Sequence, residues 1–293
     1  MSPLISVIIP TFKRLDKLKE AIKSIQSQSF KNWETIIIDN HSDDGTEEFI
    51  ESLKDKRFKF YLIRNDGVIS KSRNLGIQKS NGKYLAFLDS DDWWSPDKLN
   101  YINEAITQGY KFIYHDHYIV KPKSILKKRK FFSRSLNKEN PYEDLKLNGP
   151  CFATSSVVLE KNSLLSIDNF NEKKDFISWE DFDAWLRFLF KNQSIIHIKK
   201  FLSFIKIDNE NNLTALKKIE NIMSFKKFYI DSTHETLPNW CHIELFKNFY
   251  FLGKFGESID YYSKINKKIL KLKMRLKLEI IYLLIKLKFI YKD

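Results

Sequence analysis

Short apolar runs that end abruptly at polar residues recur along the first hundred residues, and amphipathic segments separate them. The runs that we expect to form strands are residues 4–9, 35–38, 58–63 and 84–88. The segments with apolar residues at helical spacing are 15–29, 46–53 and 72–78. Continuous β-branched runs are typical of strands buried on both faces, and their alternation with helices is typical of parallel sheets. The pattern therefore predicts an α/β domain whose mostly parallel central sheet is flanked by helices.

The remainder of the chain predicts a less regular second half and a helical end. We expect a strand at 111–120, a strand near 152–159 and a helix at 180–191. Beyond residue 210 the patterns are helical, and they include a hairpin from 245 to 262. The expected organisation is an α/β region over 1–208, with halves 1–100 and 101–208, followed by a helical region over 209–293.

Positive charge is concentrated in two segments. The formal net charge is +13, of which residues 121–138 carry +8 and residues 264–293 carry +8, which leaves the rest of the chain slightly acidic. Local basic runs indicate surfaces that meet anions, and no nucleic-acid-binding motif accompanies them. Two cysteines are too few for a disulfide scaffold, and neither a secretory pattern nor a sufficiently long apolar stretch is present. We therefore expect a cytoplasmic chain without a membrane span.

An acidic cluster, Asp89-Ser90-Asp91-Asp92, directly follows the strand expected at 84–88. Carboxylates this close repel one another unless a cation lies between them. Oxygen ligands of this kind suit Mg²⁺ or Mn²⁺, which also bind substrate phosphates. The other interpretation is a capped turn before the helix that begins near Pro96.

Three further acids stand where strands end or helices begin. Asp39 follows the second strand, where it can accept a hydrogen bond from an imide such as that of uracil, or simply cap a turn. Glu180 and Asp181 open the helix at 180–191, either as partners of the helix dipole or with Asp181 as the general base for an acceptor hydroxyl. The neighbouring Trp179 suits a sugar platform or the core.

Taken together and in order, these motifs resemble the family 2 glycosyltransferases of the GT-A fold, over residues 4–205. The segments that carry the resemblance are 6–14, 38–39 with 44–46, 72–76, 81–84, 87–93, and 179–181 with Arg187. The resemblance implies an inverting enzyme that moves one sugar from a UDP-sugar to an acceptor hydroxyl. It also implies a role in bacterial surface polysaccharide synthesis (capsule, O-antigen or lipooligosaccharide), with a hexosyl or N-acetylhexosaminyl group transferred to a saccharide or lipid-linked saccharide.

The resemblance assigns roles residue by residue. The positions that match donor contacts are Pro10, Thr11, Arg14, Asp39, Asp44, Arg73, Asp89 and Ser90. Among them, Asp39 would face uracil, Asp44 the uridine region and Arg73 the pyrophosphate. Asp91, with Asp89 nearby, would ligate Mn²⁺ or Mg²⁺, and Asp181 would be the catalytic base. The positions that match the acceptor side are Trp93, Cys151, Trp179 and Glu180.

Two departures from the family pattern refine these expectations. Asn40-His41 replaces the usual acid-and-glycine run after the uracil-binding Asp. This departure concerns the nucleotide contacts that the resemblance assigns to the loop after Asp39. The Gln-x-x-Arg-Trp motif and the membrane spans of processive members are missing from the sequence, so we expect addition of a single sugar.

The basic tail at 264–293 and the competing functions leave alternatives open. The tail predicts a largely apolar helix with lysines, suited either to an anionic bilayer surface or to packing against protein, including a second copy of the chain. The competing functions are an inactive nucleotide-sugar-binding homologue, a nucleic-acid-binding protein and a nucleotidyltransferase. The last lacks its expected glycine-rich loop, because residues 10–14 contain no glycine.

Overall fold

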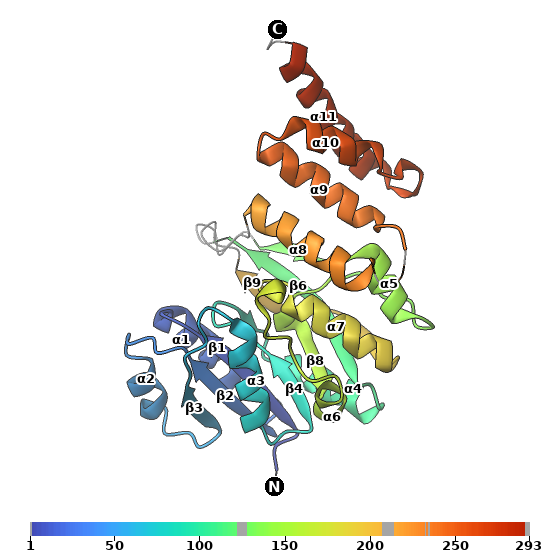
Figure 1. Ribbon diagram of the computed structural model, residues 1–293. Helices are drawn as coiled ribbons and strands as arrows, with labels where there is room; N and C mark the ends of the chain where they lie inside the picture. Colours follow the sequence, from blue (N-terminus) through green and yellow to red (C-terminus); the bar gives the residue numbers. More distant parts are fainter. Residues whose placement is uncertain (1, 122–127, 207–213, 232, 234, 291–293) are drawn as a thin grey trace. The chain divides into compact units, whose positions relative to one another are not determined.

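The computed structural model describes residues 2–121, 128–206, 214–231, 233 and 235–290 (Figure 1). The chain divides into two compact units. The first comprises Met1–Tyr142 and Pro150–Asn211, and the second comprises Glu143–Gly149 and Asn212–Asp293. Each unit is described by itself below.

Strands of the first unit form one mixed sheet in the order β3-β2-β1-β4-β8-β6-β9-β5, with β7 beside β6. The strands are β1 (Ile5–Thr11), β2 (Trp33–Asp39), β3 (Phe58–Leu62), β4 (Tyr84–Phe87), β5 (Trp93–Trp94), β6 (Phe112–Val120), β7 (Arg129–Phe131), β8 (Val157–Glu160) and β9 (Ile195–Lys206). The four strands predicted in the first hundred residues are parallel to one another, whereas β8 joins β4 and β6 antiparallel. The predicted α/β fold with a helix-flanked central sheet is confirmed.

Helices cover both faces of this sheet because the residues of β1 alternate between the two faces. The helices of this unit are α1 (Leu15–Gln26), α2 (Thr46–Ser52), α3 (Ile69–Lys79), α4 (Lys98–Thr107), α6 (Lys161–Leu165) and α7 (Glu180–Lys191), whereas α5 (Pro141–Asn148) belongs mostly to the second unit. Val7 and Ile9 belong to a core cluster with buried residues of α1 and α4. Ile8 points the other way, under Gly76 of α3, where an added Cβ would lie 2.5 Å from its Cγ2 atom. In Figure 1, α3 and α7 lie in front of the sheet.

The second half of the first unit differs from the sequence expectation at two places. The strand expected near 152–159 begins at Val157, because Thr154–Ser156 form the 3-10 helix η1 and the Ser156 hydroxyl donates to the Ala153 carbonyl at 2.6 Å. Local hydroxyl-to-backbone bonds of this kind compete with strand pairing. The twelve-residue strand β9 was not expected, since its exposed lysines interrupt the apolar pattern; it pairs with β6 in parallel.

The second unit is helical in its described part. Its helices are α8 (Ala215–Tyr229), α9 (Asn239–Phe251), α10 (Phe255–Ser263) and α11 (Leu272–Ile290). The hairpin predicted from 245 to 262 is confirmed by α9 and α10, and the helix predicted in the tail by α11. Phe246, Tyr262, Leu278 and Ile285 form the buried centre of this unit. Within the described residues, none of the helices combines the length and apolarity needed to cross a membrane.

Candidate active site

The residues predicted to bind the donor gather at the carboxyl ends of three adjacent parallel strands. β2, β1 and β4 lie side by side, and they end at Asp39, at Thr11 and just before Asp89. Ligands of open α/β sheets bind at this edge. The loops also meet here, because the Arg14 guanidinium donates from Nη1 to Oδ2 of Asp91 at 2.9 Å.

Arg73, on α3, links the acidic cluster to the start of α7. Its side chain is 4% exposed and donates from Nη1 to Oε1 of Glu180 at 2.6 Å and from Nη2 to Oδ1 of Asp89 at 3.0 Å. Burial alone would lower the pKa of Arg73, but the carboxylates of Asp89, Glu180 and Asp181 raise it above its ordinary value. The guanidinium is therefore a permanent positive charge that holds two segments 107 residues apart in sequence.

Ser155, a residue that the sequence analysis did not select, organises the acidic turn from beneath. Its hydroxyl donates to Oδ2 of Asp92 at 2.6 Å and accepts from the backbone N–H of Asp89 at 3.0 Å. The other oxygen of Asp92 accepts from the backbone N–H of Lys206 at 2.9 Å. Burial, followed by the charges of Asp89 and Asp91, raises the pKa of Asp92 well above its usual value. Asp92 thus anchors the turn inside the protein.

Lys98 is a second buried group that sequence reasoning missed. Its ammonium donates to the Ser155 carbonyl at 2.7 Å and lies 3.6 Å from the centre of the Trp94 ring. Burial lowers the pKa of Lys98 well below its usual value, although Asp92 opposes the shift. A lysine in an amphipathic helix normally signals a solvent-facing position, so the sequence contained no cue for this contact.

Asp89 and Asp91 are suited to a divalent cation that arrives together with phosphates. Burial and the neighbouring Asp89 raise the pKa of Asp91, while Arg14 opposes that shift, so negative charge is crowded at this turn. Within the described residues, no group of three or more His, Cys, Asp or Glu side chains is arranged to hold a metal. Mg²⁺ is commonly held by one or two carboxylates plus substrate phosphates and waters. Two carboxylates at the carboxyl edge of the sheet fit that description.

Asp181, the predicted base, is half-buried at the start of α7 and is held through both oxygens. Oδ2 accepts from the Thr154 hydroxyl at 2.5 Å, and Oδ1 accepts from the backbone N–H of Phe182 at 2.7 Å. Thr154 was not selected from the sequence; it belongs to η1, as does Ser155. A single turn therefore contacts both the acidic cluster and the predicted base.

The predicted nucleotide contacts Asp39 and Asp44 line one cavity of about 250 Å³. Asp39 is 2% exposed, and both of its oxygens accept from Ser42, one from the backbone N–H at 2.8 Å and one from the hydroxyl. Asp44 accepts from the backbone N–H of Leu15 at 3.1 Å and from the Thr46 hydroxyl at 2.6 Å. These bonds connect the two acids to the loop that surrounds the cavity.

The remaining predicted residues lie at different depths. Pro10, Thr11 and Ser90 are buried; among the residues the structure describes, the Thr11 hydroxyl has no hydrogen-bond partner. Trp179 is also buried, and its ring stacks on Phe176 with centroids 4.8 Å apart. The Cys151 thiol donates to the Arg134 carbonyl at 3.6 Å. Trp93 is half-buried and stacks on Phe204.

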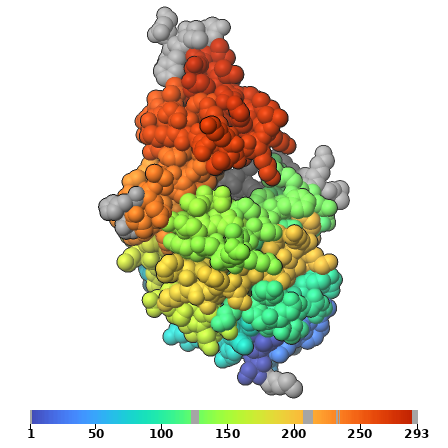
Figure 2. Space-filling model, turned by 90° about the vertical axis from the view of Figure 1, so that its right-hand side faces the viewer, coloured from blue at the N-terminus to red at the C-terminus, as the bar shows by residue number. Residues whose placement is uncertain are grey.

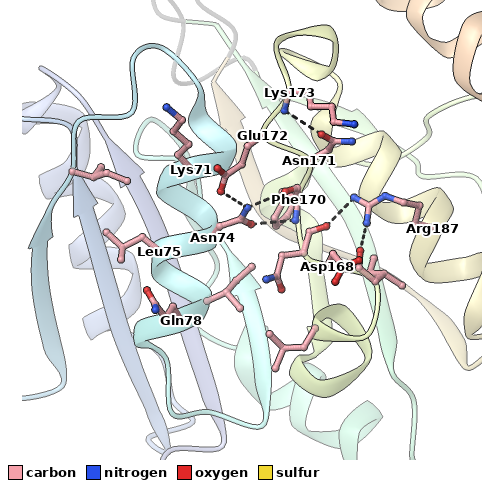
Figure 3. Close-up of a pocket in the computed structure, with 15 residues that line it drawn as sticks. Lys71, Asn74, Leu75, Gln78, Asp168, Phe170, Asn171, Glu172, Lys173 and Arg187 are labelled. Carbon is pink, nitrogen blue, oxygen red and sulfur yellow. Dashed lines mark hydrogen bonds between the residues drawn. The ribbon is translucent and has the colours of Figure 1, made fainter.

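A larger cavity, of about 1220 Å³, lies between α3 and residues 165–173 (Figure 3), and none of the predicted site residues lines it. Asn74 donates to the Phe170 carbonyl and to Glu172 and accepts from the Phe170 N–H, which fixes this segment against α3. Arg187 donates to carbonyls at its other end and to Asp183. These bonds position the chain that leads into α7 and Asp181.

Comparisons with known proteins agree with this geometry. The family model described as glycosyl transferase family 2 matches residues 6–163. The chain is 30% identical over 216 residues to the GalNAc(5)-diNAcBac-PP-undecaprenol beta-1,3-glucosyltransferase of Campylobacter jejuni, which covers 72% of this chain and 67% of that protein. It is 26% identical over 262 residues to TuaG of Bacillus subtilis, a glycosyltransferase assigned by its name to teichuronic acid biosynthesis, covering 84% and 96%.

Solved structures show the same fold. S. aureus TarS 1–349 in complex with UDP-GlcNAc superposes with a TM-score of 0.66 at 16% identity, covering all of this chain and 93% of the other. The Pyrobaculum calidifontis mannosyltransferase PcManGT, in complex with GDP-Man and Mn²⁺, gives 0.57 at 13% identity, covering 96% and 79%. The family model over residues 6–163 and the 30% identity to the Campylobacter jejuni enzyme show that this chain belongs to glycosyltransferase family 2.

Proposed function

We propose that this protein is an inverting glycosyltransferase that transfers one sugar from a UDP-sugar to an acceptor hydroxyl. The observation that carries the proposal is the connected cluster at the carboxyl edge of the sheet, where Arg73 joins Asp89 to Glu180 and Asp181 stands next to Glu180. A donor-binding edge and a base on α7 are thereby part of one rigid network.

The donor would occupy the edge from the Asp39 cavity to the acidic turn. The cavity lined by Asp39 and Asp44 suits a base and ribose. Asp89 and Asp91 follow β4, which is separated from β2 by β1 alone. A divalent ion held by these two carboxylates would neutralise the diphosphate as it leaves. TarS and PcManGT, which share this fold, were crystallised with UDP-GlcNAc and GDP-Man respectively, which supports a nucleotide-sugar donor.

The chemistry assigned to the chain's own residues is a single displacement. Asp181 takes the proton from the acceptor hydroxyl while that oxygen bonds to the anomeric carbon, and the bond from this carbon to the diphosphate oxygen breaks. The configuration inverts because attack and departure occur on opposite faces. Thr154 and the N–H of Phe182 hold the carboxylate in place, which is what an in-line attack requires.

A screen of nucleotide sugars tests this proposal. Thermal stability and donor hydrolysis are measured with UDP-, GDP-, dTDP- and CMP-sugars, with and without Mn²⁺, for the wild type, Asp91→Ala and Asp16→Ala. Asp16 is an exposed carboxylate on α1 and serves as the matched control. We expect Mn²⁺-dependent stabilisation by UDP-sugars that Asp91→Ala loses and Asp16→Ala keeps. Binding without turnover would favour an inactive homologue, and no response to any nucleotide would refute the proposal.

We also propose that the protein works on bacterial surface glycans at the inner face of the cytoplasmic membrane. The relatives support this class of product, since one is named for an undecaprenol-linked substrate and one for teichuronic acid synthesis. Exposed apolar residues of α11, among them Leu276, Leu283 and Leu287, lie on a helix with Lys/Arg at 273, 275, 277, 286 and 288. A helix of this composition suits the interface of an anionic bilayer.

Flotation with lipid vesicles tests the membrane association. The full-length protein should float with phosphatidylglycerol vesicles and not with phosphatidylcholine vesicles. Replacing Leu276 and Leu283 by Gln should abolish flotation, while Phe190→Gln, a change at an exposed apolar residue of α7, should leave it unchanged. Equal recovery of all three proteins in the soluble fraction would refute the association.

A further inference from the structure

A row of side chains crosses four neighbouring strands beside the acidic turn. In the sheet register, Lys130 of β7 pairs with Tyr118 of β6, Tyr118 pairs with Phe204 of β9, and Phe204 pairs with Trp93 of β5. Directly paired residues point to the same face of a sheet. The row therefore runs from a lysine, across a tyrosine and a phenylalanine, to a tryptophan two residues beyond Asp91.

The three rings form a continuous stack. The centroids of Trp93 and Phe204 are 5.3 Å apart with planes 5° apart, and those of Phe204 and Tyr118 are 5.1 Å apart with planes 19° apart. All three side chains are half-buried. Within β6, all residues except Tyr118 are buried. The solvent exposure of β6 is thus confined to Tyr118, which is a member of the aromatic row.

Two lysines at the β7 side of the row bring positive charge over the rings of β6 and β9. The ammonium of Lys128 lies 4.4 Å from the Tyr118 ring centre and 5.3 Å from that of Phe204, and that of Lys130 lies 5.3 Å from the Phe201 ring. Both lysines are exposed. Adjacent strands are about 4.8 Å apart, so the row extends about 14 Å from β5 to β7. It is therefore polarised, because carboxylates precede Trp93 at its β5 end and ammonium groups lie over its β6 and β9 rings.

We propose that this row, Trp93-Phe204-Tyr118 with Lys128 and Lys130, is the binding platform for an acceptor saccharide that carries an anionic group. Aromatic rings offer apolar surface to the C–H faces of sugars, and exposed ammonium groups attract phosphate or carboxylate. The sugar nearest Trp93 would be the one whose hydroxyl reacts, and the anionic group would lie at the lysines. This assignment rests on the proposed function, because the acceptor end is defined by the predicted donor site.

The position of the lysines gives the row its direction. The Trp93 end directly follows Asp91 and Asp92 in sequence, where the proposed function places the cation and the donor diphosphate. The anionic group of the acceptor is therefore assigned to Lys128 and Lys130, whose ammonium groups lie over the rings of β6 and β9. The same charge distribution suits two kinds of anionic group. One is a diphosphate that links the saccharide to a lipid, and the other is a carboxylate within the glycan itself; the experiment below separates them.

Binding of three probe saccharides tests the platform. The probes are chitotriose, which is neutral, trigalacturonic acid, which carries carboxylates, and a decyl-diphosphate-linked N-acetylglucosamine. Affinities are measured by calorimetry at low and moderate salt for the wild type, the Lys128→Ala/Lys130→Ala double variant, Trp93→Ala and Lys200→Ala. Lys200 is an exposed lysine of β9 that lies over Tyr101 of α4 instead of over the row. Figure 2 shows the α4 and β9 segments as neighbouring parts of one face.

We expect the wild type to bind at least one anionic probe on the order of tenfold more tightly than chitotriose at low salt, with each lysine contributing at most a several-fold effect. The double lysine variant should lose this preference, Lys200→Ala should retain it, and Trp93→Ala should weaken all probes. The anionic probe that is preferred identifies the source of the charge. Equal affinities for all three probes, or a preference that survives in the double lysine variant, would overturn the proposal.

The donor screen separates this inference from the proposed function. Lys128 and Lys130 are not among the predicted donor contacts, so the double lysine variant should be stabilised by UDP-sugars as the wild type is. A wild-type protein that is stabilised by UDP-sugars but shows no preference for an anionic glycan overturns only the platform. Anionic glycan binding without any nucleotide response overturns the proposed function and supports a glycan-binding role for the row.

Discussion

Replacing Arg73 by Met should destabilise the first unit strongly, because it leaves a buried carboxylate without its cation. Arg73 is 4% exposed and Glu180 is 6% exposed, and their charged groups are 2.6 Å apart. Breaking a buried ion pair by removing one partner costs about 3–5 kcal/mol. Asp89, at 34% exposed, can be solvated after the change and adds little. The melting temperature should fall by about 6–20 °C.

A double-mutant cycle shows whether the pair is responsible. Glu180→Gln leaves Arg73 paired with Asp89, so it should cost less, about 1–3 kcal/mol. Arg73→Met combined with Glu180→Gln removes both charges, so its cost should be smaller than the sum of the single costs by about 2 kcal/mol.

Urea unfolding at neutral pH, followed by tryptophan fluorescence, measures all three variants. Lys71→Met on the same helix is the matched control, because Lys71 pairs with an acid that is 76% exposed, and it should unfold close to the wild type. Additive costs in the cycle, or an Arg73→Met variant as stable as Lys71→Met, would refute the reasoning.

Three further changes probe the site and its support. Thr154→Val should lower kcat on the order of tenfold with little change in donor KM, because it removes one of the two hydrogen bonds that fix the proposed base. Thr154→Ser should restore kcat, and unchanged kinetics in Thr154→Val would contradict this role. The folded-state pKa of Asp92 is raised, so its ionisation costs stability as the pH rises above about 4. Asp92→Asn should therefore gain stability relative to the wild type between pH 4 and 7. A difference in urea unfolding that does not depend on pH would exclude this. Gly76→Ala should lower the free energy of unfolding by about 1–3 kcal/mol, because the added Cβ would overlap Ile8. Gly256→Ala places its Cβ in open space and should be tolerated. Equal melting temperatures for the two variants would contradict the packing argument.

The extent of sequence prediction differs between the two halves of the first unit. The strands β1 to β4 are continuous apolar runs, and hydrophobic periodicity identifies such elements directly. The strand β9 carries exposed lysines at 199 and 200 within its length, so its pattern resembles a polar loop. It is held in the sheet by long-range pairing with β6, which periodicity does not encode.

The sequence alone determined the order of the motifs, and hence the fold class, the family and the acids that stand at strand ends. These follow from local chemistry, since a strand that stops at a carboxylate is visible in a few consecutive residues. The tertiary structure alone decided which residues support those acids. Thr154 and Ser155 reach Asp181 and Asp92 from 27 and 63 residues away, and Arg73 reaches Glu180 across 107. Contacts over such separations depend on how the strands pair, and single residues at their ends carry no sign of the partner they will meet.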